Sequence, residues 1–235
     1  MIEYVAETGS TNADVLIRLQ QGEDIADGRW LVADRQSRGR GRQGRDWQDG
    51  AGNFMGSTVV RLQKHDHSPS SLALVAGLAV HHAVAGFLPD DAALKLKWPN
   101  DLLIDGAKTA GILLERFDDA VVVGIGVNLK SAPDLPDRAT AALADHVEID
   151  RDRFAESLAA ALQAELNMWR AQPLVATAQR WEQAGHDRGT PLDVRPPGEH
   201  PVTGAFDGLT EAGAFRLRLL DGNTRVIHAG DVFLL

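Results

Sequence analysis

Two clusters of charged residues in this 235-residue chain have the residue types and spacing expected of a site that binds and activates an anionic group. The first is residues 39–47, where Arg40, Arg42 and Arg45 alternate with glycines. Arginine offers a planar fork of N–H donors that matches phosphate or carboxylate oxygens. The interleaved glycines let backbone amides approach the same anion. A solvated, disordered loop explains this segment alone equally well, because short motifs often arise by chance.

The second cluster is residues 97–101, with the sequence Lys-Trp-Pro-Asn-Asp, followed by Lys108. Residues 94–98 alternate apolar and basic side chains, which predicts a strand with one buried face that the proline ends. Lys97 falls on the polar face, where solvation is its simplest role. A further hairpin is predicted from a strand at 102–104, a tight turn and a returning strand at 111–116, with Lys108 just before the latter. This geometry brings Lys108 and Asn100 to the same end of a sheet.

Composition excludes several classes of protein. The formal net charge of -9 argues against broad nucleic-acid binding, which usually shows as a basic face. The absence of cysteine excludes disulfides, thiolate metal sites and cysteine nucleophiles. No histidine or carboxylate grouping has the spacing of a transition-metal site. Because we find neither a signal-peptide pattern nor a run of about 18 apolar residues, we expect a cytoplasmic protein without a membrane partner.

The elements around these clusters are predicted from periodicity. A helix capped by Ser10 or Thr11 follows residues 7–12, and capping alone would account for both side chains. The arginine segment lies between strands at 29–33 and 54–62, which would present it from a rigid scaffold. We also expect a buried helix at 68–87, an apolar strand at 120–129 that ends near Asn128, a helix capped by Asp150 and a helix at 174–181.

The pattern changes after residue 184. Short strands at 192–194, 202–206, 215–220, 225–227 and 232–235 alternate with Gly and Asp-Gly turns, which is typical of a small β-barrel. We therefore expect a catalytic domain at residues 1–184 and a C-terminal β-barrel domain at residues 185–235.

Four elements together resemble the biotin protein ligases, also called biotin-[acetyl-CoA-carboxylase] ligases. They are Gly-Ser-Thr-Asn at 9–12, the segment 39–47, residues 97–101 with Lys108 and Gly-Ile-Leu at 111–113, and Gly-Ile-Gly-Val-Asn at 124–128. Each element alone is weak, but their order and spacing over essentially the whole chain are specific. The resemblance implies an α+β fold: a mixed sheet with flanking helices of the class II synthetase-like, biotin/lipoate ligase type, plus a small C-terminal SH3-like β-barrel.

The resemblance also implies a two-step reaction with ATP and Mg²⁺. The carboxylate of biotin attacks the α-phosphate of ATP, giving biotinyl-5′-AMP and pyrophosphate. A lysine of a biotin carboxyl carrier protein, a subunit of acetyl-CoA carboxylase or a related carboxylase, then attacks the mixed anhydride and releases AMP.

Residue roles carried over from the family fall into three groups. Lys108 and Arg42 are expected to be catalytic. Biotin is expected to contact Ser10, Thr11, Gln36, Arg40 and Gly111, and ATP or the adenylate is expected to contact Arg40, Arg42, Arg45, Trp47, Asn100, Asp101, Lys108 and Asn128. We assign no certain metal ligand, since Mg²⁺ is held mainly by ATP phosphates, with Asp101 as the one candidate side chain.

Two features depart from parts of the family. The Gly-Ser-Thr-Asn element starts at residue 9, which leaves no room before it for the winged helix-turn-helix of the members that also repress transcription, so we expect no DNA partner. Arg38 and Gln43 stand where the loop often has alanine and arginine, which bears on loop closure. Three alternatives remain at this point: a lipoate-protein ligase or octanoyltransferase, a protein that sequesters biotin without turnover, and an RNA-binding module. The family includes monomers and homodimers.

Overall fold

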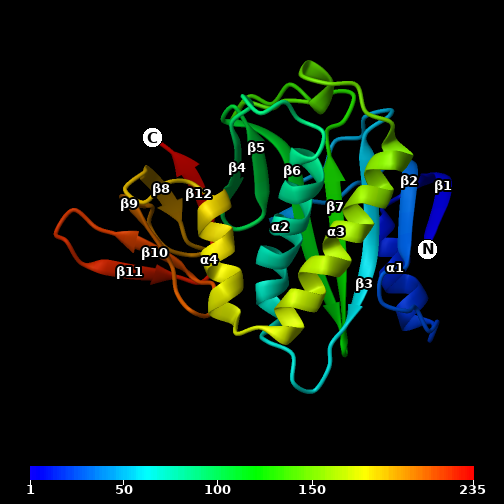
Figure 1. The fold of residues 1–235 in the computed structure, drawn as a ribbon, viewed down its shortest axis with the longest axis horizontal. Coiled ribbons are helices and arrows are strands. Elements are labelled where there is room, and N and C mark those ends of the chain that lie inside the picture. The colour runs from blue at the N-terminus through cyan, green and yellow to red at the C-terminus, as the bar shows by residue number, and fades with distance from the viewer.

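A seven-stranded mixed sheet carries both charged clusters and runs in the order β1-β2-β3-β7-β6-β5-β4 (Figure 1). The computed structural model describes residues 1–235, the whole chain. The central strand β7 (Ala120–Val127) is antiparallel to β3 (Phe54–Arg61) and β6 (Ala107–Phe117), and all but one of its residues are buried. A strand covered on both faces needs the continuous apolar run that this one has. The other strands are β1 (Ile2–Thr8), β2 (Trp30–Gln36), β4 (Leu94–Lys97) and β5 (Asp101–Ile104).

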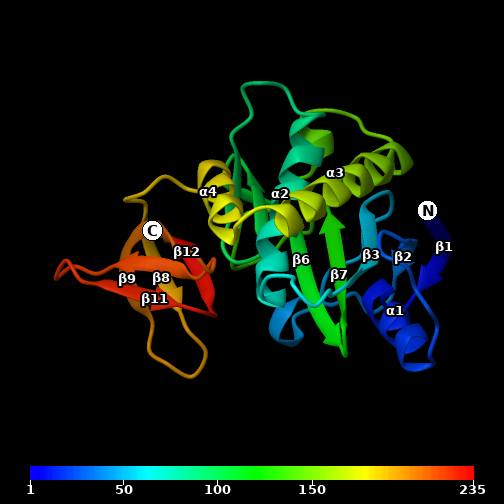
Figure 2. The same ribbon diagram turned by 60° about the horizontal axis from the view of Figure 1, so that its bottom comes forward.

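Helices cover both faces of this sheet. α2 (Leu72–Ala85), α3 (Arg151–Ala171) and α4 (Leu174–Ala184) lie over one face, and α1 (Thr11–Gln20) lies over the other (Figure 2). α2 is apolar on nearly all sides because it lies between the sheet and α3. The predicted cap of α3 is confirmed, since the Asp150 carboxylate accepts the Arg153 N–H at 2.9 Å. None of the helices combines the length and the apolar composition that a membrane span requires.

The C-terminal residues form a separate five-stranded antiparallel sheet in the order β11-β10-β9-β8-β12. Trp98, which follows β4, packs against Phe215 of this sheet with 5.3 Å between ring centroids, so the hydrophobic core continues across the junction. The predicted α+β class with a small C-terminal β domain is confirmed, while the boundary between residues 184 and 185 stays a proposal. The strands are β8 (Pro191–Arg195), β9 (Val202–Leu209), β10 (Phe215–Arg218), β11 (Thr224–Ile227) and β12 (Asp231–Leu234).

Three predictions about these elements were wrong or incomplete. β1 was not predicted, because its sequence IEYVAET has no run of buried apolar residues. Its residues are half-buried or exposed at the sheet edge, where parallel pairing with β2 holds the strand. Lys108 lies inside β6 rather than before it, since its backbone pairs with Leu103 of β5 on one side and with the segment at Thr140 on the other. The helix predicted from residue 68 begins at Leu72, because Pro69–Ser71 forms a separate 3₁₀ turn.

Candidate active site

One cavity of about 270 Å³ lies between the large sheet, the arginine segment and the C-terminal sheet. It is lined from both ends of the sequence, including residues of β12, so the C-terminal domain forms part of its wall. The structure brings every predicted site residue to this cavity: Ser10, Thr11, Gln36, Arg40, Arg42, Arg45, Trp47, Asn100, Asp101, Lys108, Gly111 and Asn128. Their individual roles stay predictions.

The arginine segment is a closed turn with its own backbone hydrogen bonds. The Trp47 N–H donates to the Gly39 carbonyl at 3.0 Å, and the Gly41 N–H donates to the Arg45 carbonyl at 2.7 Å. A Cβ on Gly39 would lie 2.5 Å from the Trp47 carbonyl oxygen, so glycine is required for this approach. The segment therefore has a defined shape that presents its guanidinium groups from the rim of the cavity.

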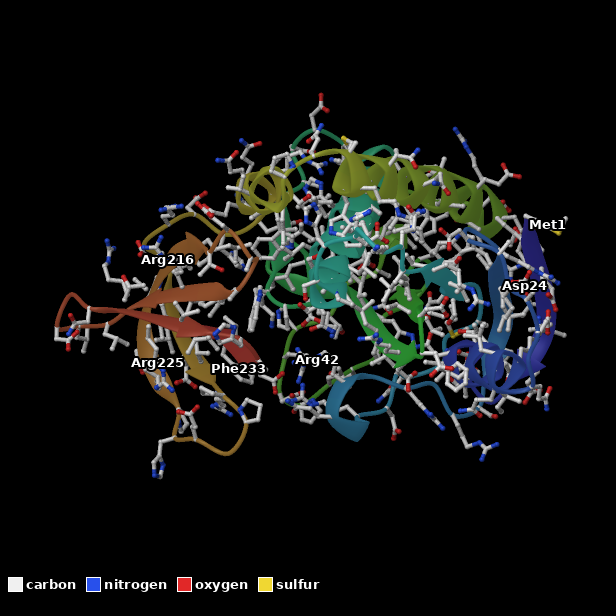
Figure 3. All side chains as sticks on the ribbon, turned by 90° about the horizontal axis from the view of Figure 1, so that it is seen from below. Met1, Asp24, Arg42, Arg216, Arg225 and Phe233 are labelled. Carbon is white, nitrogen blue, oxygen red and sulfur yellow. The ribbon has the colours of Figure 1, made fainter.

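Two arginines of this segment contact the rest of the site. One Arg42 nitrogen donates to the Asn100 side-chain oxygen at 3.1 Å and lies 3.5 Å from the Gly230 carbonyl. Arg45 pairs with Asp231 at the start of β12. Figure 3 shows Arg42 in the space between the large sheet and the C-terminal sheet, on the side where Phe233 lies. The arginine segment thus bridges the two domains.

Asp101 is the centre of a buried charge cluster. It is 7% exposed, accepts a hydrogen bond from Lys108 Nζ at 2.6 Å, and lies 3.5 Å from Lys97 Nζ. Burial opposes ionisation of Asp101, but Lys108 and Lys97 outweigh it and hold the pKa of this carboxyl below its ordinary value. Burial lowers the pKa of Lys97. The interpretation of Lys97 as a solvated residue was therefore wrong, because the chain folds back over the polar face of β4 and leaves its side chain 16% exposed.

Trp47 forms one wall of the cavity and explains two glycines. A Cβ on Gly126 would lie 2.4 Å from the indole, and one on Gly111 would lie 3.0 Å from it. Lys108 Nζ lies 5.9 Å from the centre of the same ring, within the range of a cation–π contact. β6 and β7 therefore carry glycine where the indole must lie flat against the sheet.

The opposite end of the cavity is polar and uncharged. Ser10 is the N-cap residue of α1, but its side chain makes no capping hydrogen bond, so the interpretation of capping as its whole role was wrong. The Thr11 backbone N–H donates to Gln36 Oε1 at 2.7 Å. Ser10, Thr11 and Gln36 are each at most 7% exposed, so their side-chain polar groups face the cavity or neighbouring protein groups rather than bulk water.

Sequence reasoning assigned no role to several residues that line the cavity. Ser57 had a detectable signal, since it is a polar residue inside the otherwise apolar strand β3. Arg138 and Phe233 had none, because only the fold brings the segment after β7 and the final strand to the cavity. The residues without an assigned role include Asn12, Ser57, Lys97, Arg138, Asp231 and Phe233.

The charges of the cavity suit a cation carried by nucleotide phosphates rather than one held by protein ligands alone. No group of three or more His, Asp or Glu side chains is placed to hold a metal ion. Asp101, Asp137 and Asp231 already face lysine or arginine. Mg²⁺ commonly binds through substrate phosphates with only one or two protein carboxylates, so this donor set fits a nucleotide-bound ion.

Comparisons with known proteins agree with this geometry. Residues 8–130 match the Biotin/lipoate A/B protein ligase family, and residues 195–235 match the Biotin protein ligase C terminal domain. A mixed sheet, a small C-terminal β domain and a cavity lined from both are thus the arrangement of a ligase class.

Relatives place the chain within this class. The chain is 37% identical to biotin–[acetyl-CoA-carboxylase] ligase of Paracoccus denitrificans, with 97% of this chain and 98% of that protein covered. It is 39% identical to the ligase of the same name from Mycobacterium tuberculosis, with 98% of this chain and 88% of that protein covered. The chain therefore belongs to the biotin protein ligase family. A solved structure of biotin protein ligase from Aquifex aeolicus, in complex with biotin and ATP, aligns with a TM-score of 0.85 at 26% identity and covers 100% of this chain and 98% of that one.

Proposed function

We propose that this protein activates biotin with ATP, forming biotinyl-5′-AMP and pyrophosphate, and transfers biotin to a specific lysine of a biotin carboxyl carrier protein with release of AMP. The observation that carries this proposal is a single cavity with an uncharged polar end at Thr11 and Gln36 and a cationic end at Arg42 and Lys108. A ureido ring needs paired neutral hydrogen bonds, whereas a carboxylate beside a triphosphate needs fixed positive charge.

The cationic end supports the first step. The biotin carboxylate and the α-phosphate repel each other, and Lys108 and Arg42 offset this repulsion where the new O–P bond forms and pyrophosphate leaves. Arg40 and Arg45 extend the positive charge toward the phosphates at the rim. Fixed donors at the position of developing charge cost no reorganisation during the reaction, which is why such groups contribute strongly to catalysis.

The second step uses the same cavity. The amine of the carrier lysine attacks the carbonyl of the mixed anhydride, an amide bond forms, and AMP leaves. Asn100 and Asn128 lie at the cavity wall as nucleotide contacts, and Trp47 excludes water from one side. Mg²⁺ carried by ATP would neutralise part of the phosphate charge, and Asp101, which accepts a hydrogen bond from Lys108, would be the acidic side chain available to it. We propose that the protein acts in the cytoplasm.

Pyrophosphate exchange tests this proposal directly. The purified protein is mixed with ATP, Mg²⁺ and labelled pyrophosphate, in parallel with biotin, lipoate or octanoate. We expect label to enter ATP with biotin alone, and biotin to be attached to a carrier domain when one is added. Exchange with lipoate or octanoate but not with biotin would instead identify a lipoate-type ligase. Tight biotin binding without exchange would identify a protein that sequesters biotin.

A further inference from the structure

A chain of buried polar side chains lies behind the uncharged end of the cavity. Thr11 Oγ1 lies 2.7 Å from Ser57 Oγ, and Ser57 Oγ lies 2.6 Å from Asn12 Oδ1. The Asn12 Nδ2 amide donates to Glu115 Oε2 on β6 at 2.9 Å. Asn12 is 4% exposed and Ser57 is fully buried, so these groups have few partners other than each other and the cavity.

The chemistry of the last residue fixes the direction of every hydrogen bond in this chain. An ionised carboxylate only accepts, so Asn12 must present its Nδ2 group to Glu115 and its Oδ1 oxygen to Ser57. Ser57 then donates its single proton to Asn12, which leaves the Ser57 oxygen to accept from Thr11. The Thr11 hydroxyl lies 2.7 Å from Ser57 Oγ and 3.1 Å from Gln36 Oε1, and both of these oxygens can accept its proton. The Thr11 oxygen lone pairs therefore remain for the cavity.

The orientation of the Gln36 side-chain amide is also fixed by its partner. The Thr11 backbone N–H only donates, so Gln36 must turn its Oε1 oxygen toward it, at 2.7 Å. The Gln36 Nε2 group has no acceptor within the protein and is free to donate. The wall of the cavity therefore presents an acceptor at Thr11 next to a donor at Gln36.

We propose that Glu115, acting through Asn12 and Ser57, is a positioning residue that fixes Thr11 as a hydrogen-bond acceptor for an N–H group of the substrate. This inference rests on the proposed function, because an acceptor beside a donor matches the adjacent N–H and C=O of a cyclic urea. Glu115 itself does not line the cavity. Through Asn12 and Ser57, Glu115 determines whether Thr11 donates or accepts at the cavity wall. Glu115 thereby contributes to specificity for a ureido ring that it does not contact.

The backbone makes room for this chain of side chains. A Cβ on Gly124 of β7 would lie 2.1 Å from Asn12 Oδ1, so the Asn12 amide occupies the place of a side chain on the central strand. The second Asn12 amide hydrogen faces the Leu113 carbonyl at 3.5 Å, which favours the same orientation. Glycine at this position is thus explained by the chain of hydrogen bonds, as glycine at 126 is explained by Trp47.

Exchanging the charge between residues 12 and 115 tests the proposal. In Asn12→Asp, two carboxylates oppose each other, and we expect the Kd for biotin, measured by calorimetry without ATP, to rise about tenfold or more. In the double variant Asn12→Asp/Glu115→Gln, an amide again donates to a carboxylate, residue 12 still accepts from Ser57, and the Kd should return to within about threefold of wild type. The KM for ATP should stay within about twofold of wild type in both. Asn167→Asp, on the exposed side of α3, is the charge-matched control.

Two further variants keep the test decisive if Asn12→Asp does not fold. Glu115 is only partly buried, so Glu115→Ala should fold, leave the Asn12 amide free to turn over, and weaken biotin binding. Glu115→Gln keeps an acceptor and should bind nearly as well as wild type. Wild-type biotin affinity in Glu115→Ala, or a double variant no better than Asn12→Asp, would overturn the proposed relay. Failure of the wild-type protein to bind biotin would instead overturn the proposed function.

Discussion

Replacing Asp101 by asparagine tests whether the buried charge cluster holds the catalytic lysine in place. Asp101 is the only hydrogen-bond acceptor of Lys108 in the protein and also faces Lys97, and the two lysine side chains are 18% and 16% exposed. Removing one partner of a buried ion pair costs about 3–5 kcal/mol. Because both lysines keep some contact with water, we expect Asp101→Asn to lower the free energy of unfolding by about 2–4 kcal/mol.

The same change should slow the reaction more than it weakens binding of biotin. Without its acceptor, Lys108 Nζ moves from its position, and a displacement of about 1 Å in a catalytic group costs on the order of 100-fold in rate. We therefore expect kcat for pyrophosphate exchange to fall about 100-fold, with the biotin KM within about threefold of wild type. Urea unfolding measures stability in parallel. Asp119→Asn is the control, because it breaks a surface pair with Arg61 at 3.1 Å. It should change kcat by no more than about twofold and the free energy of unfolding by no more than about 1 kcal/mol. Unchanged kcat in a folded Asp101→Asn variant would refute the positioning role.

Lys108→Ala should reduce pyrophosphate exchange by about two to three orders of magnitude, because it removes a fixed charge at the reacting phosphate, while Lys64→Ala on the exposed surface should not. Gly126→Ala should lower kcat/KM at least about tenfold and destabilise the protein by about 1–3 kcal/mol, because the new methyl group displaces the Trp47 indole; normal kinetics would show that the indole is not needed there. Burial lowers the pKa of His81 to about 4 from an ordinary 6.5, so between these pH values the unfolded chain binds the proton more tightly and stability falls as pH falls. His81→Gln should make the loss of stability at low pH smaller by about 1–2 kcal/mol, a figure reduced because the ring is partly exposed. Identical urea midpoints for the wild-type protein at pH 4.5 and pH 7 would contradict this prediction.

From the sequence we could predict which residues line the cavity more accurately than which partners they contact. Polar and charged residues in apolar surroundings, such as those at 97–101, are visible because they interrupt strand patterns and offer specific chemistry. Their partners depend on distant parts of the chain. Arg45 and Asp231 are 186 residues apart, and no local pattern relates them. Lys97 shows the same limit, since alternation placed it on the polar face of a strand but could not show that the fold covers that face.

Strand β1 was missed for a different physical reason. None of its residues is fully buried, so burial did not select an apolar pattern. The strand is held by backbone pairing with β2, which residue propensity does not report. Conversely, the glycines at 124 and 126 belong to an element that the sequence already singled out, but the groups that approach them, Asn12 and Trp47, became clear only from the structure.

Groups of the protein already neutralise most of the cations that line the cavity. Lys97 and Lys108 face Asp101, Arg138 pairs with Asp137, and Arg45 pairs with Asp231, whereas Arg40 has no acidic partner. These partners keep the positive groups in place before substrate arrives, which limits the reorganisation that phosphate binding requires. The disadvantage of these ion pairs is that an incoming phosphate must compete with a carboxylate for each cation. The pairs near the surface are weak enough to exchange, since exposed ion pairs contribute at most about 1 kcal/mol, while the buried pair at Asp101 is not. The rim arginines are therefore suited to exchange partners as nucleotide enters and leaves, and Lys108 is suited to remain fixed through both steps.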